Sequence, residues 1–272
     1  MHRVFLFSIL LLIIFSCRKD DSTFTDSGSK QKCLIEEIRD VAGDLVSKKV
    51  YNEDNVVIEE YNYDEGKIDE SHYLEKEKEG QYLYYYESKE EEPISRIYLN
   101  TDGTLNREVG IVIANDGSYE DDLNNVDSYI YNSKKQLIRL EGNGPQANGG
   151  KIEIEYDSKD RVKYISAKDK NGKEVSHYNN FTYVENRVKN DNYVNLYFAE
   201  SLSRYFLPSI NNVYIKSYDI IVPEAGMNNE DLVTKFKFDF DFSGGKLSHI
   251  TTSGEFFGIP FVLLEKITLS CK

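Results

Sequence analysis

The residue types that most often carry out chemistry are scattered in this chain of 272 residues. Three of its four histidines, His72, His177 and His249, lie far from one another in the sequence and beyond the N-terminal apolar segment. The sequence has no H-E-x-x-H or C-x-x-C motif for a metal, no G-x-S-x-G turn for a nucleophile and no glycine loop for phosphate. We therefore expect no catalytic residue, no metal site and no cofactor, and we expect that the protein is not an enzyme.

Acidic residues are so abundant that a pair of them says little about a site. Asp239 and Asp241 are two residues apart on one expected strand and share a face, an arrangement that could hold Ca²⁺ together with backbone carbonyls. A solvated outer face opposite four phenylalanines explains the same pattern, and we favour it. A glycosidase needs two carboxyl groups about 5 to 9.5 Å apart in a cleft, so a polysaccharide-active hydrolase is one alternative to a binding function.

Tyrosine is the most informative excess, because the chain has 21 Tyr, 14 Phe and no Trp. Tyr61 and Tyr63, like Tyr84 and Tyr86, are two residues apart on expected strands, which places the rings of each pair on one face. Exposed tyrosine provides rigid contact area for sugars or proteins. These four are our candidate ligand-contact residues; the alternative is that they form cross-strand pairs that stabilise a large sheet.

The strands that must position these residues are written most clearly at residues 152–165, I-E-I-E-Y-D-S-K-D-R-V-K-Y-I. Apolar and acidic residues alternate there, so they lie on opposite faces of a strand, and a polar turn precedes a second alternating run. Looser copies of this hairpin have their second aromatic residue at 63, 86, 131, 156, 183 and 242, several of them 23 to 27 residues apart. Such a period predicts supersecondary units that stack on one another.

These patterns predict an all-β fold, a long antiparallel meander of repeated hairpins with at most one or two short helices. We expect an open or partly folded-over sheet. Asp-Gly and Asn-Gly pairs between the alternating runs favour two-residue type I′ turns. Phenylalanines at alternate positions of residues 236–242 are expected to share a face, and the one expected helix covers residues 199–206.

The start of the chain reads as a targeting segment. Residues 1–16 combine a short basic region with a twelve-residue apolar run that is too short to span a bilayer comfortably, as in a signal peptide. The run ends in I-F-S-C, which resembles the lipobox of bacterial lipoproteins and implies that Cys17 is lipidated. We expect residues 17–32 to be the lipidated cysteine with a flexible polar tether, and residues 33–272 to be a single domain.

The repeats also resemble a known family. Y-D-E-G-K-I at residues 63–68 and Y-D-S-K-D-R-V at residues 156–162 are similar to YD repeats, the Y-D-x-x-G-R-L hairpin units of Rhs-type proteins. With the lipobox and an R-K-D-D tether, which resembles a surface-export signal, the chain is similar to Bacteroidota surface lipoproteins of unknown function. That resemblance implies a long antiparallel meander, often an open sheet, at the cell surface, and it transfers no catalytic residue.

The charge of the chain restricts its partners. A formal net charge of −14 argues against DNA or RNA, which require basic surfaces. It also argues against a polybasic membrane contact, so the lipid anchor alone must hold the protein at the outer membrane. We expect a surface-exposed binding or interaction module for a glycan or protein ligand. The alternatives are the hydrolase and a purely structural envelope protein.

Two further cysteines bracket the expected domain. Cys33 opens the first expected strand, and Cys271 lies one residue from the C-terminus. The compartment beyond the inner membrane permits disulfides, so the two could pair if the sheet closes and brings their Cα atoms within about 7 Å. In the open sheet that we favour, they would lie at opposite edges as separate thiols.

Overall fold

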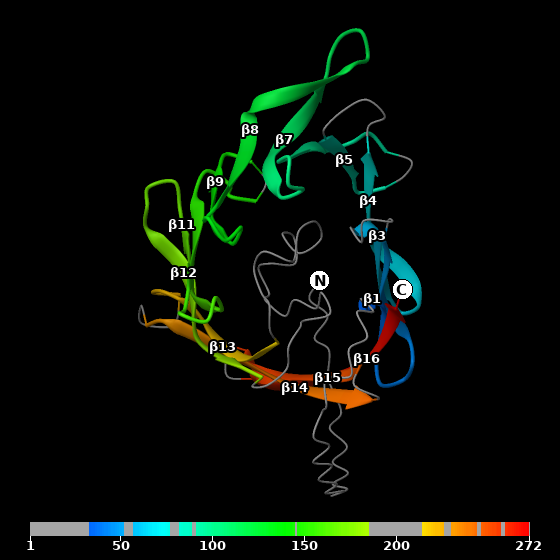
Figure 1. Ribbon diagram of the computed structural model, residues 1–272, viewed down its shortest axis with the longest axis vertical. Coiled ribbons are helices and arrows are strands. Elements are labelled where there is room, and N and C mark those ends of the chain that lie inside the picture. The colour runs from blue at the N-terminus through cyan, green and yellow to red at the C-terminus, as the bar shows by residue number, and fades with distance from the viewer. Residues whose placement is uncertain are drawn as a thin grey trace, which may run out of the picture. The chain divides into compact units, whose positions relative to one another are not determined.

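The computed structural model describes residues 33–51, 57–76, 82–88, 91–144, 146–184, 214–225, 230–243, 246–256 and 259–271, all within one compact unit, residues 31–272. The regular elements of these ranges are sixteen β-strands (Figure 1). In chain order they are β1 (Cys33–Arg39), β2 (Leu45–Tyr51), β3 (Val57–Asp64), β4 (Lys67–Lys76), β5 (Tyr82–Tyr86), β6 (Ser95–Leu99), β7 (Leu105–Ile113), β8 (Tyr119–Tyr131), β9 (Leu137–Gly142), β10 (Lys151–Tyr156), β11 (Val162–Lys168), β12 (Glu174–Tyr183), β13 (Ile215–Val222), β14 (Leu232–Ser243), β15 (Lys246–Phe256) and β16 (Ile259–Cys271).

Each strand pairs antiparallel with the next, and β16 pairs with β1, so the sheet is a closed barrel. The predicted all-β antiparallel meander is confirmed. The helix expected over residues 199–206 lies outside the described residues. In the part of the chain that the structure describes, no helix is long and apolar enough to cross a membrane.

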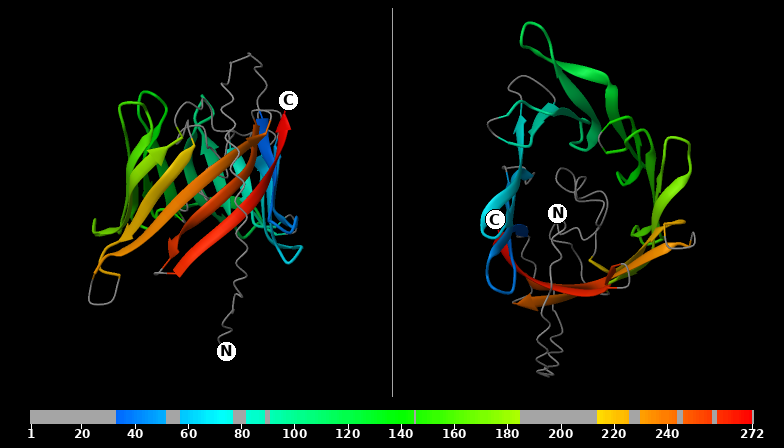
Figure 2. Two further views of the ribbon diagram at one scale, coloured as in Figure 1. Left: turned by 90° about the horizontal axis from the view of Figure 1, so that it is seen from below. Right: turned by 180° about the vertical axis from the view of Figure 1, so that it is seen from behind.

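The prediction of an open or partly folded-over sheet is wrong. β1 and β16 pair from Cys33↔Cys271 to Arg39↔Lys266, and the blue first strand lies beside the red last strand in Figure 1. Figure 2 shows the tilt of the strands that closure of a barrel requires. Strands twist and coil, and closure gives hydrogen-bond partners to backbone groups that two free edges would leave unpaired.

The turn type predicted for the Asp-Gly and Asn-Gly pairs is also wrong. At Gly103, Gly117 and Gly172, only the glycine has positive φ, and its N–H binds the carbonyl three residues earlier. This is a type I turn followed by a left-handed residue that starts a bulge. Two successive residues with positive φ, as a type I′ turn requires, occur instead at Glu65 and Gly66, which is not an Asp-Gly or Asn-Gly pair.

The β10–β11 turn shows why an acidic residue follows the tyrosine of a repeat. Asp157 Oδ1 accepts the N–H groups of Lys159 at 2.8 Å and Arg161 at 3.0 Å, and Asp157 Oδ2 binds the Arg161 guanidinium at 2.7 Å. Partial burial would raise the pKa of Asp157, but these interactions outweigh burial and lower it. One carboxylate thus fixes the turn and the start of the next strand.

Tyrosines of the repeats join neighbouring hairpins. The Tyr156 hydroxyl donates to the carbonyl of Leu137 at 2.8 Å, and the Tyr183 hydroxyl donates to the carbonyl of Val162. The Arg161 guanidinium lies 4.6 Å from the centre of the Tyr183 ring. In both cases a tyrosine at the end of one strand binds the first residue of the strand before it.

The two faces of the barrel wall have opposite character. The four phenylalanines of β14, and also Ile152, Ile154 and Tyr156 of β10, belong to one hydrophobic cluster, so the predicted shared faces are confirmed. The residues before and between the phenylalanines are exposed: Lys235, Lys237, Asp239 and Asp241. Because the sheet is closed, we assign the buried apolar face to the inside and the charged face to the outside.

Candidate functional site

The outward face of β3–β8 carries a cluster of tyrosines. Strand alternation places Tyr82, Tyr84 and Tyr86 on one face of β5, and places Leu83 and Tyr85 on the other, where they pack against the hydrophobic core. The three outward tyrosines are partly exposed. This wall therefore has an aromatic outer surface where β10 and β14 have charged ones.

Cross-strand pairing extends this surface on both sides of β5. Tyr84 lies opposite Arg96 and Tyr82 opposite Tyr98 on β6, and Tyr86 lies opposite Tyr73 on β4. Opposed residues of an antiparallel pair share a face and contact each other. We call the resulting surface the tyrosine face; its members are Tyr61, Tyr73, Tyr82, Tyr84, Tyr86, Arg96, Tyr98, Tyr119 and Asp121.

The rings of the tyrosine face pack against one another at their edges. The Tyr82 and Tyr84 centroids are 5.4 Å apart with an interplanar angle of 85°, and Tyr84 and Tyr119 are 6.0 Å apart at 65°. Tyr82 and Tyr98 are 5.4 Å apart, and Tyr84 and Tyr86 are 6.3 Å apart. Edge-to-face contacts of this kind stabilise each ring in one orientation, so the surface is organised before any ligand arrives.

Arg96 is the centre of this arrangement. Its guanidinium binds Asp121 Oδ1 at 2.5 Å, the Tyr84 hydroxyl at 3.0 Å and the Tyr119 carbonyl at 3.1 Å. It also lies 4.6 Å from the centre of the Tyr82 ring and 5.2 Å from that of Tyr84, within the range of cation–π attraction. One cation therefore connects β5, β6 and β8.

Hydroxyl groups of the tyrosine face donate to carboxylates at its borders. Tyr98 donates to Asp121 Oδ2 at 2.6 Å, Tyr61 donates to Glu59 at 2.6 Å, and Tyr86 donates to Glu75 at 3.3 Å. Tyr119 donates to Glu92 in the same way. Burial, and then the Glu75 carboxylate, raise the pKa of Tyr86 to about 12. The phenols therefore stay protonated at neutral pH and remain hydrogen-bond donors.

The structure brings together three of the four sequence-predicted tyrosines. Tyr84 and Tyr86 are neighbours, and Tyr61 contacts the Tyr73 ring edge-on at 5.7 Å. Tyr63 is separate: it lies at a register shift near the end of β3, opposite Ile68. The rings pair across strands, as one interpretation expected, and they are partly exposed. Contact with a ligand stays a prediction.

Sequence reasoning missed Arg96, Tyr98 and Asp121. Arg96 and Tyr98 alternate on β6 as the tyrosines do on β5, which was a usable signal. Asp121 is 25 residues from Arg96 in sequence, and only the fold of the β7–β8 hairpin returns it to β6. No spacing rule for a local motif connects those two positions.

The chemistry of the tyrosine face suits a ligand with both apolar faces and hydroxyl groups. Aromatic rings stack on C–H surfaces, phenols donate hydrogen bonds, and bordering carboxylates accept them. Carboxylates from Glu59, Glu75, Glu92 and Asp121 outnumber the guanidinium groups of Arg96 and Arg107, the latter 4.2 Å from the Tyr98 ring centre. An anionic ligand would meet like charge there.

Two carboxylates on the neighbouring strands β7 and β8 are enclosed instead of exposed. Glu108 is 2% exposed; it accepts a hydrogen bond from the Ser95 hydroxyl at 2.6 Å and one from the Tyr129 hydroxyl at 3.4 Å. Burial raises the pKa of Glu108, and the nearby Asp127 raises it further. The two residues are opposed across the strand pair.

Asp127 is fully buried and binds backbone instead of a ligand. Its carboxylate accepts the N–H groups of Gly144 at 3.0 Å, Gln146 at 2.8 Å and Ala147 at 3.3 Å. A side chain at position 144 would not fit, because a Cβ there would lie 2.5 Å from the Asp127 carboxylate. We assign this pair of carboxylates to the anchoring of the β9–β10 loop.

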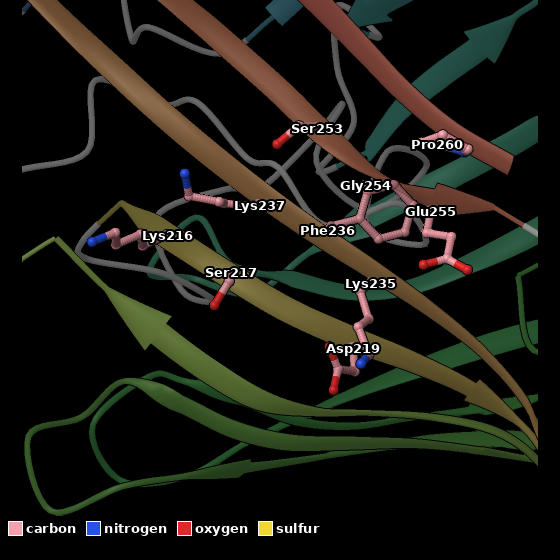
Figure 3. A pocket seen from close by; sticks show the side chains of 10 residues that line it. All are labelled: Lys216, Ser217, Asp219, Lys235, Phe236, Lys237, Ser253, Gly254, Glu255 and Pro260. Carbon is pink, nitrogen blue, oxygen red and sulfur yellow. The ribbon is translucent and has the colours of Figure 1, made fainter. Parts of the chain in front are cut away.

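A shallow hollow of about 440 Å³ lies over β13–β16 (Figure 3). Lys216, Lys235 and Lys237 line it, and Lys235 lies beside Asp219, its partner across the strand pair. The lysines are exposed, and Lys237 already binds Asp239 at 2.9 Å. Exposed and partly paired lysines do not fix an anion in one place, so we give this hollow no function.

The histidines and the Asp239/Asp241 pair also have local explanations. His72 contacts the Tyr85 hydroxyl through Nδ1 at 2.5 Å, and His177 contacts Glu174 through Nδ1 at 2.8 Å. Asp239 and Asp241 are exposed on the outer face of β14, as the favoured reading expected. Within the described ranges, no three His, Cys, Asp or Glu side chains are grouped so that they could hold a metal ion.

Comparisons with known proteins give likenesses of fold only. No family model matches the chain, and no curated protein matches it. A porin-like protein from Bacteroides vulgatus ATCC 8482 has a TM-score of 0.49 at 11% identity, over 86% of this chain and 98% of that one. A porin-like protein from Bacteroides uniformis ATCC 8492 has a TM-score of 0.43 at 12% identity, over 89% and 98%. The TcdB2-TccC3-Cdc42 structure has a TM-score of 0.32 at 13% identity, over 79% of this chain and 9% of that chain.

Proposed function

We propose that this chain is a lipid-anchored binding protein of a bacterial outer membrane and that it binds a neutral saccharide on its tyrosine face. The observation that carries the proposal is the partly exposed cluster of rings held in fixed orientations around Arg96. Fixed aromatic surfaces lose little conformational entropy on binding. This surface is therefore suited to recognition more than to the stability of the sheet alone.

The charged outward face of β14 supports attachment through lipid. A barrel that spans a bilayer turns an apolar band outward and a polar surface inward. Here the outward residues of β14 from position 235 to 241 are two lysines followed by two aspartates, and the inward ones are phenylalanine. Acylation at Cys17, followed by the tether of residues 17–32, provides the attachment that such a wall does not.

The carboxylates at the borders of the tyrosine face support a neutral ligand. The hydroxyls of Tyr61 and Tyr86 are directed to Glu59 and Glu75, and the chain carries a net charge of −14. Sugar hydroxyls can donate to these carboxylates and to the phenol oxygens, which keep lone pairs free to accept. Sulfated or uronic-acid glycans would be repelled by the same groups.

A hydrolase is less well supported. Glu108 and Asp127 are the enclosed carboxylate pair in the described residues, and both are occupied by hydroxyl and backbone donors. A glycosidase needs carboxyl groups that flank a bound glycosidic bond in a cleft. We therefore propose binding without hydrolysis.

A glycan array probed with the purified full chain in mild detergent tests the proposal. We expect the protein to bind neutral glycans and not to bind anionic ones. Tyr84→Ala should weaken binding at least about tenfold, because one aromatic contact contributes roughly 1.4 kcal/mol or more. Tyr164→Ala is the matched control, because Tyr164 is also a partly exposed tyrosine with a hydrogen-bonded hydroxyl, which donates to Glu174, but it lies on β11, outside the tyrosine face.

Three results would contradict the proposal: no glycan bound, a preference for anionic glycans, or equal losses in both variants. Circular dichroism of each variant must match that of the parent, so that a loss of binding is not a loss of fold. Hydrolysis products from a bound glycan would instead favour the enzyme.

A further inference from the structure

We propose that Cys33 and Cys271 form a disulfide bond that fastens the first strand of the barrel to the last. The inference rests on the exported location in the proposed function, and not on its ligand. It concerns the β1–β16 seam, the pair of strands whose contact turns a meander into a closed barrel.

The register of the seam places the two cysteines directly opposite each other. Cys33 pairs with Cys271 at the end of the ladder, followed by Leu34 with Ser270 and Ile35 with Leu269. Opposed positions of an antiparallel pair have Cα atoms about 4.5 or 5.5 Å apart, and disulfides form at about 4.4–6.8 Å. Both spacings therefore permit the bond without moving the backbone.

The position of the two cysteines at the end of the seam indicates what the bond would do. The ladder has a register shift between Ile35 and Glu37, which weakens backbone pairing near this end. Cys33 is also the first residue that the structure describes, next in sequence to the segment proposed as the tether. A covalent bond here would stop the seam from opening at the end that is pulled when the anchored chain is under load.

The chemistry is an ordinary thiol–disulfide exchange. One cysteine thiolate attacks an oxidised protein disulfide of the cell envelope and forms a mixed disulfide, from which one thiolate of the oxidant leaves. The second cysteine then attacks the mixed disulfide and releases the other thiolate. Two thiols lose two protons and two electrons to become one disulfide, and the oxidant becomes a dithiol.

Peptide mapping of the full chain tests the bond. Cells are quenched with acid, free thiols are blocked with an alkylating reagent, and the detergent-extracted protein is digested with trypsin without reductant. Trypsin cleaves after Lys32, Arg39 and Lys266, so the expected product is Cys33–Arg39 joined to residues 267–272. Reductant should separate the two peptides and lower the Tm of the intact protein by at least about 5 °C, because the closed loop is very long.

A shifted variant provides the control. Cys271→Ser combined with Leu269→Cys keeps the number of thiols but moves one to the position opposite Ile35, diagonal to Cys33. Diagonal Cα atoms are about 7–8 Å apart, so this variant should yield alkylated peptides and little linked product. Equal linkage in both proteins would overturn the proposal, because it would show that the register does not direct the bond.

A second arm separates the geometry from the location. The reduced, purified full chain is oxidised in a glutathione buffer. Linked peptides from cells and from this buffer support the proposal. Alkylated Cys33 and Cys271 in the protein from cells overturn the proposal. If the glutathione buffer then links the two cysteines, the assumption of export has failed. If the buffer does not link them, the register of the seam has failed.

Discussion

The ion pair of Arg96 and Asp121 should make the tyrosine face a single rigid unit, and a double-mutant cycle can measure this. The two side chains are 11% and 18% exposed and their nearest atoms are 2.5 Å apart. Arg96→Met keeps the aliphatic volume between the Tyr82 and Tyr84 rings but removes the charge. Asp121→Asn keeps the shape and an acceptor for Tyr98.

The expected magnitudes follow from what each change leaves behind. Arg96→Met leaves the Asp121 carboxylate without its cation and removes two further hydrogen bonds, so it should lower the free energy of unfolding by about 3 kcal/mol, the low end for a buried pair because some solvent reaches it. Asp121→Asn should lower it by about 2 kcal/mol. The double variant leaves no unpaired charge and should cost about 3 kcal/mol, so the coupling energy is about 2 kcal/mol.

Urea denaturation of the detergent-solubilised full chain, followed by circular dichroism, gives these free energies if the slope with urea stays constant. The control is the Lys173–Glu224 pair, which is nearly as close, at 2.7 Å, but 65% and 61% exposed; its cycle should give no coupling beyond experimental error. A coupling between Arg96 and Asp121 that is no larger than that of the control would refute the claim that Arg96 organises the tyrosine face.

Three further predictions concern the loop anchor, the buried acid and the lipid. Gly144→Ala should lower the free energy of unfolding by roughly 2 kcal/mol in urea, because its Cβ would meet the Asp127 carboxylate; an unchanged midpoint would count against the anchor. Burial raises the pKa of Glu108, so the folded protein gains stability as the pH falls from 7 through that pKa toward the pKa of Glu108 in the unfolded chain. Glu108→Gln should therefore be more stable than the parent at pH 7 by roughly 1 kcal/mol, and this difference should shrink by pH 5. Cys17→Ser should abolish palmitate labelling and release the protein from membranes, and a labelled, membrane-bound variant would disprove the anchor.

Local structure was predictable from the sequence because it depends on neighbours in the chain. Period-two alternation identified the shared faces of β10 and β14 correctly, since a strand has no other way to bury its phenylalanines together. The turns were less predictable. Asp102 before Gly103 satisfies a type I′ turn and a type I turn with a bulge equally well, and the pairing of the flanking strands decided between them.

The candidate site was half predictable for a related reason. Tyr84 and Tyr86 can be identified from the sequence by their spacing on β5. Arg96 and Asp121 do not, because their meeting depends on the lengths of β6–β8 and on the register shift between Val109 and Gly110. Such a shift is set by the coiling of the whole wall, and no window of sequence contains it.

Closure was the feature least visible in the repeats, and the repeats explain why. Each unit binds the preceding one through contacts such as Tyr156 to Leu137 and Tyr183 to Val162. That rule adds hairpins without fixing how many complete a circle. β1 and β16 contain no tyrosine at all, so the seam lacks this link between units. It has in its place backbone pairing from Cys33↔Cys271 to Arg39↔Lys266. A bond between the two cysteines would therefore act at a junction to which neither strand contributes a tyrosine.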